Sequence, residues 1–237
     1  MNILIDFILC ILAIVTLLIA TGKNTIVTIA RFLALVLSVT VATFLADWAA
    51  APLSEKIPNP MVQVAVNEMA DAVGTPIYGK VDQTLAQLDY DAFMTSPDRA
   101  ELVKSYGRTE AQIQQLLADA ENQNAAAVAA FLAQPIWQTI IEAVLLGGAT
   151  ILLYLVLVAV FRTVLYRTFP KDKKKKVAIF TVLFAVLSAV IVVSYVAVPI
   201  MESFRPYAMG FIKSLQWDYA CEQSTLYGIF KMLYILG

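Results

Sequence analysis

The chain has 237 residues, of which 60% are apolar and 15% are charged, and it contains no histidine. Its mean hydropathy is +0.74. A soluble domain is about 45–50% apolar and about 25% charged. This composition therefore excludes an ordinary water-soluble globule, a disordered chain and a disulfide scaffold. The lack of histidine also excludes Ser-His-Asp hydrolases and zinc hydrolases with histidine ligands.

Four apolar stretches are long enough to cross a membrane, which takes about 20 residues. We expect spans from about Ile3 to Ala20, Ile26 to Ala50, Ile136 to Phe161 and Val177 to Ile200. The first span is expected to be retained rather than removed as a signal peptide, because no basic residue precedes it and no clear cleavage site follows it. Cys10, within this span, is expected to be a buried apolar thiol.

Small residues recur at every fourth position of the second span. Such a row lets two helix backbones approach closely, and a repeat of four residues favours a right-handed crossing. We expect this span to be the central packing helix, facing small residues of the third span; the alternative is that alanine is simply common here. The expected packing residues are Ala30, Ala34, Ser38, Ala42 and Ala46, with Ala50 ending the row, and Gly147 and Gly148.

The segment between the second and third spans is too long for a turn and too polar to cross a membrane. Helix starts and stops are expected at Asn59-Pro60, Gly74, Thr75-Pro76, Ser96-Pro97-Asp98 and Gly107. Thr109-Glu110-Ala111-Gln112 is a capping-box pattern, and we expect its helix to extend through an alanine-rich stretch until Pro135. The segment is either a helical cap packed on itself and on the membrane surface, or a docking surface for a partner.

The charges predict the orientation of the spans. Residues 52–138 contain eleven acids and five bases, whereas residues 162–176 contain seven bases and one acid. Because basic loops stay in the cytoplasm, we expect the 162–176 loop and the turn at 21–25 to be cytoplasmic, and both termini and the acidic segment to lie outside. The residues expected to set the topology and to contact lipid head groups, rather than nucleic acid, are Arg162, Arg167, Lys171, Lys173, Lys174, Lys175 and Lys176.

An acidic residue lies near the outer end of each expected span: Asp6, Asp47, Glu142 and Glu202. Ionisable groups at this depth are candidates for a cation or proton site, which would suit a small transporter or channel. The alternative, which we favour, is that they are interfacial residues at the ends of apolar runs. No intramembrane base or histidine completes a proton relay.

The C-terminal tail is expected to carry a short interfacial helix. Ser224 is expected to cap the helix at 226–236, which is too short to span and rich in aromatic anchors.

Asp89 and Asp91 are expected in a polar loop and do not indicate a glycosidase. Nucleotide-binding, hydrolase, thiol-redox and zinc-protease motifs are absent from the sequence. We therefore expect no enzyme, and so no catalytic residues, no metal and no cofactor.

Several short motifs resemble the CvpA (colicin V production protein) family of bacterial inner-membrane proteins. These motifs are the start Asn2-Ile3-Leu4-Ile5-Asp6, the turn Gly22-Lys23, Arg31, Ala46-Asp47-Trp48, the basic loop 162–176 and the tail Glu222-Gln223-Ser224-Thr225-Leu226-Tyr227. The resemblance implies a multi-pass protein of the inner membrane with a non-enzymatic envelope role, in toxin production or export and in membrane homeostasis.

The expected fold is therefore all-α and polytopic, with four transmembrane helices. Residues 1–51 would form one hairpin, 52–135 an extracytoplasmic helical segment, 136–201 a second hairpin and 202–237 the interfacial tail. The expected function is an accessory or scaffold role in the envelope; the alternative is a small transporter or channel, or a subunit of one. The expected partners are the lipid bilayer and either a second copy or another envelope membrane protein.

Overall fold

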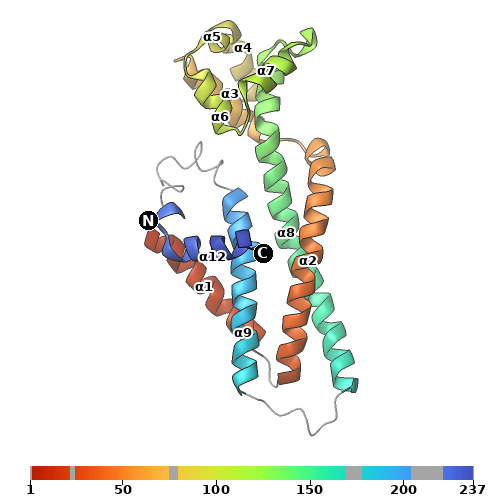
Figure 1. Cartoon of the computed structure of the whole chain (residues 1–237). Helices are drawn as coiled ribbons and strands as arrows, with labels where there is room; N and C mark the ends of the chain where they lie inside the picture. Colours follow the sequence, from red (N-terminus) through yellow and green to blue (C-terminus); the bar gives the residue numbers. More distant parts are fainter. Residues whose placement is uncertain (1, 22–24, 75–79, 169–177, 204–220, 237) are drawn as a thin grey trace. The chain divides into compact units, whose positions relative to one another are not determined.

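The computed structural model describes residues 2–21, 25–74, 80–168, 178–203 and 221–236 (Figure 1). All secondary structure in these ranges is helical, so the expected all-α class is confirmed. The chain divides into two compact units. Unit 1 comprises Met1–Ala49 and Glu142–Gly237, and unit 2 comprises Ala50–Ile141.

Within the described ranges, three helices are long and apolar enough to cross a membrane. They are α2 (Thr25–Lys56), α8 (Ala125–Thr168) and Ile179–Ser203, which contains most of α9 (Ala178–Val192), the π-helical turn η3 (Val193–Ala197) and residues 198–203. The π turn lies just before Pro199, whose missing N–H interrupts the helical hydrogen bonds. Helix α1 (Asn2–Ala20) is also apolar, but its stretch Ile5–Ala20 is shorter than these three.

The surface of unit 1 is apolar on every long helix. Exposed large side chains include Phe7 on α1 (60% exposed), Phe44 on α2 (72%), Leu152 on α8 (68%) and Ile179 on α9 (74%). Among the described residues of unit 2, Ile57 is the one large apolar side chain in the exposed class. Water-soluble proteins rarely expose large contiguous apolar patches. Unit 1 therefore has the surface of a membrane protein, whereas unit 2 has the surface of a water-exposed one.

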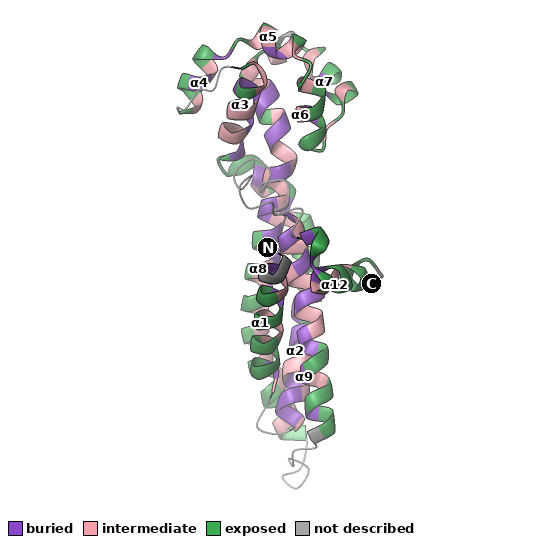
Figure 2. Ribbon diagram, turned by 90° about the vertical axis from the view of Figure 1, so that its left-hand side faces the viewer, coloured by how far each residue is buried: buried purple, intermediate pink, exposed green. Residues whose placement is uncertain are grey.

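Helix α12 (Thr225–Leu236) packs on α1 and η3, and α1 packs along α9. The core of this contact contains Ile5 and Leu9 of α1, Val193 of η3, and Tyr227 of α12, with Cys221 just before it. Figures 1 and 2 both show α12 running across α9 rather than alongside it. The two ends of the described chain therefore meet in one apolar cluster.

The expected row of small residues on α2 is buried. Ala30, Ala34, Ser38 and Ala42 are 0% exposed, and Ala46 is 1% exposed. Ala42 and Ala46 pack against Leu146 of α8, with Leu145, Ala149 and Leu153 at the edge of the contact. A contact of this kind is what small residues allow between membrane helices, and the packing role of the whole row stays a prediction.

The two glycines of α8 have different environments. A Cβ atom on Gly147 would lie 3.4 Å from Cδ1 of Ile200, at the short end of ordinary van der Waals contact, so the Ile200 side chain packs over this glycine. Gly148 is exposed, and a Cβ atom there would meet nothing within 4 Å. Consecutive residues are about 100° apart around a helix, which explains why Gly148 makes no such contact within the described residues.

Unit 2 is built from short helices around a small core. They are α3 (Met61–Ala72), α4 (Val81–Gln87), α5 (Tyr90–Thr95), α6 (Arg99–Ser105), α7 (Glu110–Leu117), the 3-10 turn η1 (Ala120–Asn122) and the first part of α8. The core contains Met69, Phe93, Val103, Ile113 and Leu132, each at most 1% exposed. Tyr106 is also buried, beside Glu68. Burial raises the pKa of Tyr106, and the nearby Glu68 carboxylate raises it further.

Most of the expected helix ends of unit 2 are confirmed. Oδ1 of Asn59 accepts from the Met61 N–H at 2.9 Å, and Gly74 and Gly107 have positive φ angles of 70° and 69° after α3 and α6. Thr109 and Gln112 form the expected capping box. Thr75-Pro76 lies outside the described residues.

The prediction that Asp89 and Asp91 lie in a polar loop is wrong. The Asp89 carboxylate accepts from the Ala92 N–H at 2.9 Å and caps α5, which contains Asp91. An aspartate before a short run of helix-compatible residues provides the acceptor that the first turn needs.

The expected helix end at Pro135 is also wrong. Helix α7 ends at Leu117, and α8 starts after Asn124, whose Oδ1 accepts from the Ala127 N–H at 2.8 Å. Helix α8 then continues through Pro135. A proline inside a helix leaves the carbonyl four residues earlier without its donor. Here that carbonyl, of Phe131, accepts from Nε and Nη2 of Arg108 at 3.3 and 3.1 Å.

Arg108 therefore supplies the hydrogen bonds that Pro135 cannot. Its guanidinium also lies 4.0 Å from the centre of the Phe131 ring, in cation–π contact. Burial lowers the pKa of Arg108, but an arginine remains charged at neutral pH. The contact ties the loop between α6 and α7 to α8 and lets the helix pass through unit 2 without a break.

We predict that Arg108→Met destabilises unit 2 by about 1.5–3 kcal/mol, because a hydrogen bond to a charged donor is lost and the partly buried carbonyl of Phe131 is left unpaired. Amide hydrogen exchange of residues 125–135 in the full chain would measure this loss. In a Pro135→Ala background, the restored N–H of residue 135 satisfies the same carbonyl, and the cost of Arg108→Met should fall. Equal costs in both backgrounds would contradict this assignment.

We also predict that Ala34→Ile together with Ala42→Ile cripples folding, because each substitution overfills a closed contact at a cost of about 1–3 kcal/mol. Thermal unfolding and monodispersity of the detergent-purified protein would measure the effect. Thr40→Ile with Thr43→Ile is the matched control, since both threonines are exposed on the same helix. The packing role is refuted if the two double variants are equally stable.

Candidate functional site

The first polar cluster of unit 1 lies where α1 meets α12. Oδ1 of Asp6 accepts from the Ser224 hydroxyl at 2.6 Å and from the Leu226 N–H at 2.9 Å. The Ser224 hydroxyl in turn accepts from the Tyr227 N–H at 3.0 Å, which confirms Ser224 as the cap of α12. The carboxylate of Asp6 thus satisfies the start of a helix that lies far away in the sequence, and a negative charge at a helix N-terminus is favourable.

Glu202 forms the second anchor of α12. Its Oε1 lies 2.5 Å from Nζ of Lys231 and accepts a hydrogen bond from the Tyr227 hydroxyl. The Lys231 ammonium also lies 5.8 Å from the centre of the Tyr227 ring. Asp6 and Glu202 therefore both serve to hold α12 in place.

Asp47 and Glu142 form a separate pair. They project from α2 and α8, close enough for the charge of Asp47 to act on Glu142. Asp47 is exposed and Glu142 is half-buried. The structure therefore divides the acids at the expected outer boundary into an α12 anchor and a carboxyl pair. Among the described residues, no group of three or more His, Cys, Asp or Glu is arranged to hold a metal ion.

Arg31 closes the other end of α1. Its Nη1 donates to the carbonyl oxygens of Ile19 and Thr21, each at 2.6 Å. The last carbonyls of a helix have no donors within the helix, and a positive charge there is favourable. Arg31, on α2, thereby fixes the end of α1 and keeps its Nε and Nη2 donors for another acceptor.

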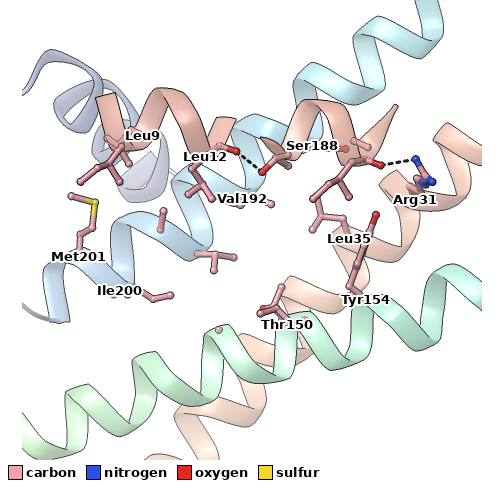
Figure 3. Close-up of a pocket in the computed structure, with 18 residues that line it drawn as sticks. Leu9, Leu12, Arg31, Leu35, Thr150, Tyr154, Ser188, Val192, Ile200 and Met201 are labelled. Carbon is pink, nitrogen blue, oxygen red and sulfur yellow. Dashed lines mark hydrogen bonds between the residues drawn. The ribbon is translucent and has the colours of Figure 1, made fainter. Parts of the chain in front are cut away.

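A cavity of about 470 Å³ lies inside unit 1, between α1, α2, α8, α9 and η3 (Figure 3). Most of its wall is apolar, with Leu9, Met201 and Ile200 at one end. Arg31 and Tyr154 lie at the other end (Figure 3). Cavities of this size are within the range of ligand pockets, roughly 300–1,000 Å³.

The remaining expected site residues are placed as follows. Arg162 and Arg167 are exposed near the end of α8, with the Arg162 guanidinium 5.9 Å from the centre of the Tyr166 ring. Lys171, Lys173, Lys174, Lys175 and Lys176 lie outside the described residues. The expectation that Cys10 is buried is wrong, because Cys10 faces outward on α1.

Arg31, Thr150 and Tyr154 were not singled out as a site by the sequence. An arginine near the start of an apolar run is a weak signal on its own, since it also fits a topology role. Thr150 and Tyr154 are four residues apart and share a face of α8, but only the packing of α1 and α9 over that face makes it the wall of a cavity.

We predict that Asp6→Ala releases α12, because the Ser224 hydroxyl and the Leu226 N–H lose their acceptor; the expected cost is about 1–3 kcal/mol. Hydrogen exchange of residues 225–236 would detect the release. Asp6→Asn keeps an oxygen at the same place and should release α12 less. Cys10→Ala, on the exposed side of the same helix, is the control; exchange as slow in Asp6→Ala as in this control would contradict the anchoring role.

Comparison with models of protein families, with curated proteins and with solved structures finds no match for this chain. No residue role is therefore transferred to it from a relative. What the site does has to follow from its own geometry.

Proposed function

We propose that the chain is a non-enzymatic integral membrane protein with an accessory or scaffold role in the bacterial cell envelope, as its resemblance to the CvpA family implies. The observation that carries this proposal is the use of charged side chains in unit 1. Asp6, Glu202 and Arg31 each bind another part of the same unit. Such contacts support a framework rather than a reaction centre.

The proposed topology has four spans in the inner membrane, with α1 as the first. Its 19 residues are close to the length that a span needs. The basic loop at 162–176 would be cytoplasmic, and unit 2 and both termini would lie outside. Trp48, 72% exposed at the end of the apolar part of α2, suits a membrane–water interface.

Helix α12 is proposed to lie in that interface. One side of it contributes Tyr227 and Phe230 to the core of unit 1, while Ile229, Met232 and Ile235 are exposed by 50%, 68% and 69%. A helix that is apolar on both sides and runs across α9 (Figure 1) would place its exposed side in lipid.

Unit 2 is proposed to present the surface that a partner recognises. It has its own core and a polar exterior, and residues 52–138 contain eleven acids against five bases. The acidic excess disfavours contact with anionic lipid head groups and suits a basic protein surface. The partner would be another envelope membrane protein or a second copy of the chain.

A small cation or proton transporter is the second candidate. The adjacent carboxyl groups of Asp47 and Glu142 favour it, because two carboxyl groups within reach of each other can share a proton or hold a cation. Flux across liposomes would separate the two candidates. The transporter requires a flux that Asp47→Asn with Glu142→Gln abolishes, whereas the scaffold requires none.

Cysteine labelling tests the proposed topology. In a Cys10→Ala, Cys221→Ala background, Gln115→Cys in unit 2 and Lys174→Cys in the basic loop would be probed with a membrane-impermeant maleimide. Gln115 is exposed, so its labelling does not depend on unfolding. We expect Gln115→Cys to react in intact spheroplasts and Lys174→Cys only after permeabilisation. The reverse pattern would invert the orientation.

Photo-cross-linking in cells tests the scaffold role. A photoreactive amino acid at Gln115 should give a discrete cross-linked product, and the same amino acid at the lipid-facing Leu152 should not give that product. Identical products from both positions, or none from several exposed positions of unit 2, would remove the support for a scaffold.

A further inference from the structure

The cavity of unit 1 contains a polar group that the protein does not satisfy. Thr150 is only 6% exposed and lines the cavity, and its Oγ1 has no hydrogen-bond partner among the described residues. Two other hydroxyl groups in the wall are satisfied: Thr16 donates to the Leu12 carbonyl at 2.8 Å, and Ser188 donates to the Phe184 carbonyl at 2.8 Å. A buried polar group without a partner is costly, so Thr150 points to a ligand that supplies one.

Arg31 makes the cavity electrostatically asymmetric. Among the 18 described residues that line it, Arg31 is the one charged side chain. The carbonyls of Ile19 and Thr21 accept from a single nitrogen, Nη1, and being neutral they leave its positive charge uncompensated. Figure 3 shows Arg31 and Tyr154 together at one end, away from Leu9 and Met201.

We propose that this cavity binds one acyl chain of an anionic amphiphile. The chain would lie between Leu9, Val192 and Ile200, and its acidic group would lie at Arg31. The Thr150 hydroxyl would donate to an oxygen near the head of the chain. This inference does not depend on the scaffold role and applies to the membrane unit alone.

The chemistry of the wall selects this occupant. An apolar wall around a single cation disfavours a soluble polar metabolite, whose hydroxyl groups would be buried without partners. A neutral hydrocarbon would leave both Arg31 and Thr150 unpaired. An acyl chain with an anionic head satisfies the apolar and the polar end together, since burial of methylene groups is favourable and a charge-assisted hydrogen bond is strong.

The test uses the full chain in nanodiscs of phosphatidylcholine, with binding measured by native mass spectrometry. The probes are oleate and oleyl alcohol, which share a chain and differ in the charge of the head. We expect one equivalent of oleate to bind about tenfold more tightly than oleyl alcohol, the size of effect that one charge-assisted hydrogen bond produces. Equal affinity for the two probes would overturn the proposal.

Two substitutions test the polar end. Arg31→Gln keeps an amide donor for the carbonyls of α1 but removes the charge, and it should weaken oleate binding about tenfold while leaving oleyl alcohol unchanged. Thr150→Val removes the unpaired hydroxyl at nearly constant shape. It should weaken oleate binding without lowering the thermal stability of the ligand-free protein. Full oleate affinity in both variants would contradict the assigned roles.

A matched pair of substitutions on α9 tests the location. Val192→Phe fills the cavity, whereas Val186→Phe makes the same change at a position that is 42% exposed and outside the cavity wall. Oleate binding should be lost in the first variant and retained in the second. Equal binding in both would overturn the proposal. If Val192→Phe does not fold, the oleate affinities of Arg31→Gln and Thr150→Val decide whether the proposal holds.

Competition between lipids identifies whether the bound acyl chain belongs to a phospholipid or to a free fatty acid. Replacing part of the phosphatidylcholine by phosphatidylglycerol displaces oleate if the head of an anionic phospholipid can reach Arg31. If phosphatidylglycerol does not compete, the site takes a free fatty acid. Either result supports the anionic acyl site, whereas a lack of oleate binding in nanodiscs of phosphatidylcholine alone would overturn it.

Discussion

A polar group inside an apolar helical unit must find its partner within the protein, because hydrocarbon offers no hydrogen bonds. Unit 1 meets this constraint with long-range contacts. The Asp6 carboxylate satisfies the first turn of α12, and the Arg31 guanidinium satisfies the last carbonyls of α1. Side-chain hydrogen bonds thus attach helix α1 to other helices near both of its ends. The positions of α1 and α12 depend on these contacts as much as on apolar packing.

Small residues and glycine set how closely the helices approach. In unit 1, Ala42 and Ala46 lie against Leu146 of α8, and Ile200 packs over Gly147. Association of helices in lipid gains little from hydrophobic burial, so close contact is the main attractive term. In unit 2, by contrast, water drives the burial of Phe93 and Leu132, and capping groups such as Thr109 and Asp89 end the short helices.

Two buried hydroxyl groups of unit 1, those of Ser194 and Thr150, have no hydrogen-bond partner among the described residues. Of the two, Thr150 lines the cavity. It shares that cavity with Arg31, whose charge no carboxylate neutralises among the described residues. A lipid in this place would complete the wall between α1 and α8.

The sequence by itself determined what depends on local chemistry. Hydrogen bonding and side-chain size within a few residues are enough to predict several features. These are the apolar runs of about 20 residues, the row from Ala30 to Ala46, the capping box at Thr109 and the cap at Ser224. Only the tertiary structure decided what depends on distant partners. Helix α8 passes through Pro135 because Arg108 supplies the missing donor, and Asp6 became an anchor because α12 packs beside it. The cavity forms where four helices pack together, and no local sequence pattern predicts which faces of these helices will enclose it.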